Sequence, residues 1–387
     1  MREKLMSVIM FSISLGMVAV IILFGMIILQ EMNINVIQAI STEITEISDN
    51  DNIFINESNE KTVEEDIETP QIIQKNPLDN LQQNTVSNNQ SINNNIIIDK
   101  HFYNQLNEYS KTIYKALEVN KEEMKTGVAE VQIGDDFSEI LDKENGQELL
   151  GQYYQSAIEA YTYDNPDVFY LSPSKMYLNI ETTTSRLSNK KSYRVFINSG
   201  NKSNYLIEEL SSKEHIDDAL IKINQVKNKI LSNKTGNTYE DIKMVHDYLV
   251  DNLSYDTTVL KPNIYNMYGA LVNKVCVCEG YARSFKYLMD CLNIPCVVVI
   301  GKGINSEGQI ENHAWNYVEL DGKWYAVDAT WDDPIVVGGE TASPASKYRY
   351  FLKGSSEINK DHTSNGQFTE NGKVFKYPEI SYDDYSF

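Results

Sequence analysis

Three residues, Cys278, His313 and Asp328, stand in the order that a cysteine nucleophile, its general base and an orienting carboxylate require. The thiolate is the reactive form of cysteine, and an adjacent imidazole can take its proton while a carboxylate fixes the imidazole tautomer. Each of these residue types alone is usually structural. Their combination predicts nucleophilic catalysis at Cys278, and little else in the chain suggests chemistry.

Cys278 stands at the start of a predicted helix that runs over 278–292. The free N–H groups and the macrodipole at a helix N-terminus favour a negative sulfur, and the same groups can form an oxyanion pocket. Gly280 lets this first turn run close to neighbouring backbone or substrate. We therefore expect Gly280 and Tyr281 to line a substrate cleft beside the sulfur.

His313 and Asp328 lie on two predicted strands, 313–320 and 323–328, joined by a turn at Asp321-Gly322. If these are the two turn residues, Asp328 lies opposite Trp315 on the partner strand. His313 and Asp328 then share one face at a diagonal separation of about 7–8 Å, within reach of the two side chains. One imidazole nitrogen would face Asp328 and the other would face the sulfur.

All three tryptophans, Trp315, Trp324 and Trp331, fall in the same short stretch. Aromatic walls would exclude water from a cleft, and we take Trp315 and Trp331 as cleft candidates. A role as core or supporting residues is the equal alternative.

The four cysteines lie within 21 residues. Their spacing lacks the paired C-x2-C pattern of structural zinc sites, and disulfide scaffolds suit small domains without a core. We expect no metal and no cofactor, with Cys291 and Cys296 as buried apolar residues. A disulfide among Cys276, Cys291 and Cys296, and a redox or metal role for the cluster, are alternatives.

The chain has 387 residues and a formal net charge of -21, which argues against a nucleic-acid partner. Residues 5–30 carry no charge and are long enough to cross a bilayer, and no small-residue cleavage site follows. We expect residues 1–30 to be a cytoplasmic N-terminus and an uncleaved transmembrane signal anchor, with a cleaved signal peptide as the alternative. Because Arg2 and Lys4 precede the span, the chain after it should be extracellular, in a single-pass cell-membrane protein.

Residues 31–100 are rich in Asn and acidic side chains and show no hydrophobic period, so they predict a disordered linker. The pattern over residues 101–235 predicts a smaller α/β domain. The pattern over residues 236–387 predicts a catalytic domain with a C-terminal extension. In the first domain, the predicted helices are 102–117, 147–161 and 205–231, and the predicted strands are 128–133, 168–171, 175–180 and 192–198. In the second domain, a further helix is predicted over 238–252, with Thr238 and Asp241 as a capping pair, and a further strand over 294–301.

Three motifs together resemble the transglutaminase-like superfamily of papain-like cysteine enzymes. They are Cys-Glu-Gly-Tyr-Ala at 278–282, His-Ala-Trp-Asn at 313–316, and Trp-Tyr-Ala-Val-Asp-Ala-Thr-Trp-Asp-Asp-Pro at 324–334. Residues 240–335 carry this resemblance. Residues 164–169 and the tail at 350–362 are similar to segments of bacterial, membrane-anchored surface members of the group.

The resemblance implies an α+β fold in which a papain-like, Cys-bearing helix packs on an antiparallel β-sheet. It also implies a thioester acyl-enzyme, with Cys278 as nucleophile, His313 as general base and acid, and Asp328 as the orienting residue. Cys276 lies two residues before Cys278 and so does not directly precede the Glu-Gly-Tyr run, as that role requires.

We therefore expect an extracytoplasmic cysteine acyl-transfer enzyme that acts on protein or peptide amides at the cell surface or cell wall. Crosslinking and hydrolysis are both open, since the family includes crosslinkers, peptidases and amidases. The alternative function is a catalytically inactive cell-surface binding module that retains the fold.

Overall fold

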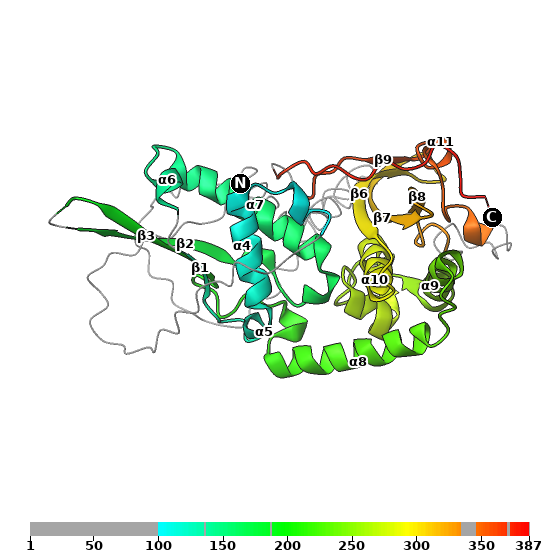
Figure 1. The fold of residues 1–387 in the computed structure, drawn as a ribbon. Helices are drawn as coiled ribbons and strands as arrows, with labels where there is room; N and C mark the ends of the chain where they lie inside the picture. Colours follow the sequence, from blue (N-terminus) through cyan, green and yellow to red (C-terminus); the bar gives the residue numbers. More distant parts are fainter. Residues whose placement is uncertain (1–99, 135–136, 186–187, 334–345, 370–371, 387) are drawn as a thin grey trace, which may run out of the picture. The chain divides into compact units, whose positions relative to one another are not determined.

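The structure is a computed structural model that describes residues 100–134, 137–185, 188–333, 346–369 and 372–386 (Figure 1). The predicted membrane span and all but the last residue of the predicted linker lie outside these ranges. None of the helices within them is long and apolar enough to cross a membrane. The anchor, the linker and the predicted domain boundary at 235 stay predictions.

The first described elements are helices and a small antiparallel sheet of order β1-β3-β2. The helices are α4 (Glu108–Val119), α5 (Lys121–Met124), α6 (Ser138–Leu141), α7 (Gly146–Asp164) and α8 (Lys213–Leu231). The strands are β1 (Val131–Gly134), β2 (Tyr177–Thr184) and β3 (Lys191–Asn198). Helix α4 starts later than predicted because the side chain of Asn107 caps it, accepting from the N–H of Ser110 at 2.9 Å.

One predicted element in this part is wrong, and another begins later than predicted. Residues 168–171 are not a strand, because Pro166 begins a 3-10 turn, η2 (Pro166–Val168), and the N–H of Leu171 then bonds to the carbonyl of Val168 at 3.0 Å. The helix predicted from residue 205 begins only at Lys213. Ser212 caps it, and a 3-10 turn, η4 (Glu208–Leu210), precedes it, while Leu206 forms a β-bridge with Leu171.

The second sheet has the strand order β8-β7-β6-β9, and every neighbouring pair is antiparallel. Its strands are β6 (Cys296–Ile304), β7 (Ile310–Leu320), β8 (Lys323–Val327) and β9 (His362–Ser364). Asp321 and Gly322 have φ of 53° and 74°, the left-handed values that a two-residue hairpin turn requires. The predicted register is confirmed, with Leu320 opposite Lys323 and Asn316 opposite Val327.

Helix α10 (Cys278–Cys291) packs on strands β7 and β6, next to helix α9 (Thr238–Asn252) (Figure 1). The chain enters α10 from β5 (Val275–Cys276), which pairs in parallel with β4 (Ser254–Tyr255). The predicted capping pair of α9 is displaced by one residue, since the side chain of Asn237 accepts from the N–H of Glu240 at 3.1 Å. The result is a mixed α/β fold with an antiparallel sheet.

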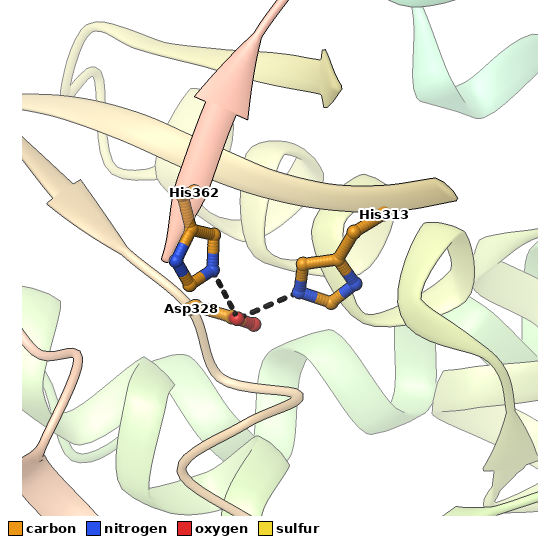
Figure 2. Close-up of side chains that lie close together, drawn as sticks. All are labelled: His313, Asp328 and His362. Atoms are coloured by element: carbon orange, nitrogen blue, oxygen red, sulfur yellow. Dashed lines mark hydrogen bonds and ion pairs between the residues drawn. The ribbon is translucent and has the colours of Figure 1, made fainter. Parts of the chain in front are cut away.

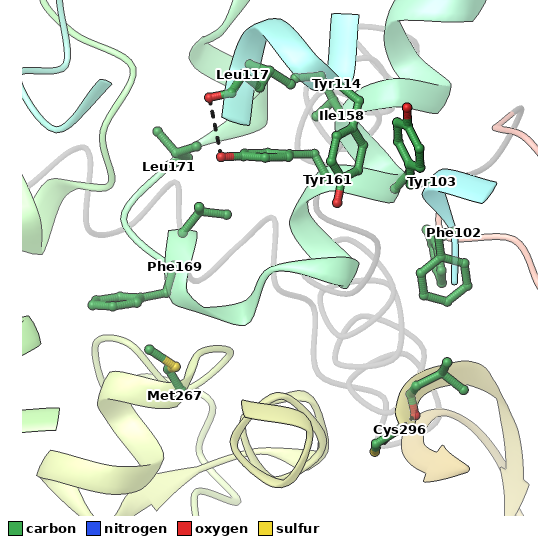
Figure 3. Close-up of a cluster of buried hydrophobic side chains, with 14 of the residues drawn as sticks. Phe102, Tyr103, Tyr114, Leu117, Ile158, Tyr161, Phe169, Leu171, Met267 and Cys296 are labelled. Carbon is green, nitrogen blue, oxygen red and sulfur yellow. Dashed lines mark hydrogen bonds between the residues drawn. The ribbon is translucent and has the colours of Figure 1, made fainter. Parts of the chain in front are cut away.

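The hydrophobic core joins the C-terminal segment to the first helices. Figure 3 shows its aromatic part around Tyr114 and Tyr161, with Tyr103 beside Tyr114. The ring of Phe102 meets those of Phe368 and Phe375 edge-on, at centroid distances of 5.1 and 5.3 Å. Residues at opposite ends of the described chain are therefore held in one core.

Gly280 in the first turn of α10 permits a close backbone approach. A Cβ there would collide with the Cβ of Cys276 and lie 2.7 Å from the carbonyl oxygen of Ile264. That carbonyl accepts the N–H of Val277 at 3.0 Å, which fixes the approach to Cys278.

We expect Gly280→Ala to lower the free energy of unfolding by about 1–3 kcal/mol, because the added methyl group overpacks this turn. Gly151→Ala is the matched control, since Gly151 also lies within a helix and its Cβ would meet no atom within 4 Å. That change should be neutral or stabilise by about 0.5–1 kcal/mol. Denaturant titration measures both, and equal stability losses would contradict the packing argument.

Candidate active site

The sulfur of Cys278 lies at the first residue of α10 and faces strand β7. The backbone N–H groups of Ala314 and Glu279 point at it. The residue is only 4% exposed. The structure thus brings the predicted nucleophile next to the strand that carries His313, through the residue that follows His313.

His313 and Asp328 form the hydrogen bond that the hairpin register predicts. His313 Nε2 and Asp328 Oδ2 are 2.7 Å apart, and both residues are buried (Figure 2). The other oxygen, Oδ1, accepts the N–H groups of Thr330 and Trp331 at 3.0 and 3.2 Å. Burial raises the pKa of Asp328, but the charge of His313 and the hydrogen bonds from His313 and His362 outweigh burial and hold that pKa well below its usual range.

The hydrogen bond to Asp328 uses one ring nitrogen of His313, and the second ring nitrogen is Nδ1. It makes no hydrogen bond to the described residues, and no hydrogen bond joins the two described side chains Cys278 and His313. Catalytic hydrogen bonds are often long before substrate binds and tighten in the complex.

The thiol of Cys278 is harder to ionise than its place on the helix suggests. Burial raises its pKa to about 12, although the N–H groups of Ala314 and Glu279 oppose this. Nearby carboxylates, Glu279 and Asp328, add to the rise. The predicted stabilisation of a negative sulfur by the helix N-terminus is therefore outweighed by burial, and the resting residue is a thiol.

The four predicted cleft residues are all buried: Gly280, Tyr281, Trp315 and Trp331. Tyr281 donates its hydroxyl to Asp333 at 2.6 Å. Trp331 stacks on the ring of His313 at a centroid distance of 4.7 Å. These contacts give them supporting roles, and their place in a cleft stays a prediction.

The prediction of the site missed His362, which follows Asp361 and opens β9. Its Nε2 lies 3.1 Å from Asp328 Oδ2, so Asp328 stands between two histidines (Figure 2). Its Nδ1 lies 2.7 Å from Asp361 Oδ1. The only signal in the sequence was its place at the end of the tail at 350–362, because the pairing of β9 with β6 alone brings it to the site.

The loop after β8 carries two more buried carboxylates with defined partners. Asp332 Oδ2 lies 3.0 Å from Nε2 of the buried His246 on α9, and Asp332 Oδ1 accepts the N–H of Tyr350 at 2.8 Å. Asp333 accepts the hydroxyl of Tyr281. These contacts hold the backbone on which Asp328 sits.

Nitrogen and oxygen atoms of His313, Asp328 and His362 all lie within 4.8 Å of one another, a spacing that can also suit a metal ion. Here both histidines lie at hydrogen-bond distance from Asp328 Oδ2, and the second nitrogen of His362 is paired with Asp361. These distances suit protons held between the histidine nitrogens and the carboxylate oxygens, so we assign no metal to the three residues. The four cysteines are free thiols, including Cys276 and Cys296.

A family model described as "Transglutaminase-like superfamily" matches residues 224–329. This part of the chain belongs to the transglutaminase-like superfamily. Members of this superfamily are cysteine acyltransferases or peptidases, which places the transglutaminase-like domain in a general papain-like enzyme class.

Individual proteins are similar to parts of this chain. Kyphoscoliosis peptidase of Mus musculus is 36% identical over 67 residues, and that of Homo sapiens 34%; each match spans 15% of this chain and 10% of the peptidase. The matched segment is thus a small part of those relatives. A solved structure of a TGase has a TM-score of 0.28 at 16% identity, with 44% of this chain and 48% of the other covered.

Loss of the Asp328 charge should destabilise the domain. We expect Asp328→Asn to lower the free energy of unfolding at pH 7 by about 3–5 kcal/mol, because it breaks a buried ion pair. Since the pKa of Asp328 is lowered by folding, its contribution is present above the unfolded value near 4 and is lost as pH falls. The variant should therefore lose less stability than the wild type below about pH 4.

The control is Asp251→Asn, whose carboxylate pairs with Lys347 at 2.7 Å on an exposed surface. It should cost at most about 1 kcal/mol. Denaturant titrations at several pH values measure both variants. An Asp328→Asn protein as stable as the control at pH 7 would contradict the prediction.

Proposed function

We propose that the chain is a cysteine acyl-transfer enzyme that acts on protein or peptide amides. Cys278 is the nucleophile, His313 the general base and then acid, and Asp328 the residue that orients the imidazole. The observation that carries this proposal is the His313–Asp328 hydrogen bond beside the sulfur of Cys278, with Nδ1 of His313 left over for the thiol.

In the proposed reaction, His313 takes the thiol proton as the sulfur of Cys278 attacks the amide carbon. A base is needed at that moment because burial raises the thiol pKa to about 12. The C–S bond forms, and backbone N–H groups at the start of α10 are available to the oxyanion. The C–N bond then breaks, the proton passes from His313 to the departing amine, and a thioester on Cys278 remains.

The acceptor decides the product. Attack on the thioester by a lysine amine gives an isopeptide bond, and attack by water gives hydrolysis; either acceptor gives up a proton to His313 and frees the thiol. We propose protein or peptide substrates at the cell surface or cell wall. Incubation of the protein with a glutamine-containing peptide, with and without a primary amine, followed by mass spectrometry, separates transamidation, deamidation and backbone cleavage.

We further propose a single-pass membrane location with the N-terminus in the cytoplasm and the domain outside. The uncharged stretch at 5–30, which follows Arg2 and Lys4, supports this. Protease added to intact cells should then digest the transglutaminase-like domain. Full protection in intact cells, with digestion after lysis, would contradict an outward orientation.

One observation favours a second function, a catalytically inactive binding module that retains the fold. The sulfur is buried and resists ionisation. The two functions differ in how the thiol reacts with iodoacetamide across pH. A reactive site shows base-assisted alkylation near neutral pH, whereas an inactive module shows alkylation only as the isolated thiol ionises, at or above about pH 8.5.

Replacement of the nucleophile should abolish activity without unfolding the protein. We expect Cys278→Ala to lose all iodoacetamide-sensitive activity on the peptide substrate. Cys276→Ala is the control, since that buried thiol lies two residues away and should keep the activity. Activity retained in Cys278→Ala would refute the assignment.

Replacement of the base tests the role of the imidazole. His313→Ala should lower kcat/KM by about 10²–10⁴-fold, the range that general acid–base groups contribute. His215→Ala serves as a control, since its side chain lies on the exposed part of α8. Equal activity of the two variants would exclude His313 as the base.

A further inference from the structure

His362 lies between two carboxylates in the interior of the protein. Its Nε2 is 3.1 Å from Asp328 Oδ2, and its Nδ1 is 2.7 Å from Asp361 Oδ1. The residue is 2% exposed. Strand β9 places it there by pairing with β6, where His362 stands opposite Gly303.

This geometry defines the protonation of His362. An ionised carboxylate offers only acceptors, so each ring nitrogen must carry a proton to bond to its neighbour. Burial lowers the pKa of His362, but the hydrogen bonds and charges of Asp328 and Asp361 outweigh burial and raise it overall. Despite burial, the pKa of Asp328 is lowered, first by His313 and then by His362, and the pKa of Asp361 is lowered by His362 and Tyr350. This geometry and these charges favour the imidazolium form of the ring.

Further described groups near His362 are aromatic rings and the partners of Asp361. Tyr350 donates its hydroxyl to Asp361 at 2.7 Å, and Arg349 lies 3.8 Å from the same carboxylate. The rings of Trp331, Trp315, Tyr350 and His313 lie at centroid distances of 4.5, 4.9, 5.2 and 5.5 Å from His362. The side chain thus has one defined position, and Asp361 holds its far end.

We propose that His362 is a positioning residue of the active site, which as an imidazolium anchored by Asp361 fixes the Asp328 oxygen that faces His313. The inference rests on the proposed function. The charge and hydrogen bond of His362 at Asp328 Oδ2 add to those of His313 in keeping this carboxylate ionised. Together with the N–H groups of Thr330 and Trp331 on Oδ1, they keep it turned toward His313. Asp361 contacts His362 and not Asp328, so its effect on the site passes through His362.

A second buried histidine offers a matched comparison. His246 Nε2 lies 3.0 Å from Asp332, and its Nδ1 lies 3.2 Å from Asp247, the adjacent residue in the chain. Burial lowers the pKa of His246, but the hydrogen bonds and charges of Asp247 and Asp332 outweigh burial and raise it overall. This pair has the same construction as Asp361 and His362 but touches Asp332 in place of Asp328.

The test compares Asp361→Asn with Asp247→Asn in the full chain, with ring-15N histidine and NMR detection. His362→Gln identifies the His362 signals by their loss. We expect both nitrogens of His362 to be protonated at pH 7 in the wild type. Asp361→Asn should lower the midpoint at which His362 titrates, by roughly one pH unit or more.

The same variant should alter the site beyond His362. Loss of the positive charge beside Asp328 makes protonation of His313 easier. The acid limb of Cys278 alkylation, which is the fall in its rate at low pH, should therefore move to higher pH in Asp361→Asn. The pH at which the ring signals of His313 change should move in the same direction. Asp247→Asn should shift the His246 signals and leave this limb in place. A purely structural role for His362 would lower stability and move neither readout.

Two outcomes would overturn the proposal. One is a neutral His362 ring at pH 7. The other is an Asp361→Asn protein in which His362 titrates differently while His313 and the alkylation limb do not change. If Cys278 of the wild type shows no base-assisted alkylation, the proposed function fails separately, and the His313 signals still decide whether His362 acts on Asp328. Asp361 is one-fifth exposed, so the variant should fold.

Discussion

The hydrogen bond between His313 and Asp328 depends on the register of one hairpin. Asp321 and Gly322 take left-handed conformations that match the twist of the flanking strands, and this sets Leu320 opposite Lys323. Because side chains alternate across a strand, a slip of one residue would move His313 to the other face of the sheet. Helix α10, packed on the same strand, then needs only to present Cys278 at the level of Ala314.

Buried carboxylates define the loop that follows this hairpin. Asp328, Asp332 and Asp333 are all buried, and a buried charge is tolerated only when it is paired and hydrogen bonded. Asp328 and Asp332 are paired with His313, His362 and His246, three of the five histidines of the chain. Three histidines of this acidic chain thus compensate buried negative charge.

Burial also decides the state of the sulfur. The helix N-terminus and two N–H groups favour the thiolate of Cys278, but removal from water opposes it more strongly. A thiol in this state attacks only when a base takes its proton in the same step. The hydrogen bond that orients His313 is therefore tied to reactivity as well as to stability, and the contacts of Asp328 bear on both.

Local patterns in the sequence determined the β7–β8 hairpin with its register, the extent of α9 and the start of α10 at Cys278. Their turn residues and hydrophobic periods act over a few positions. The same patterns gave a false strand at 168–171 because Pro166 turns the chain there. Only the tertiary structure decided the burial of Tyr281 and the place of His362, since both depend on packing between segments far apart in the chain. Such contacts leave no periodic trace in the sequence, and so they could not be predicted from it.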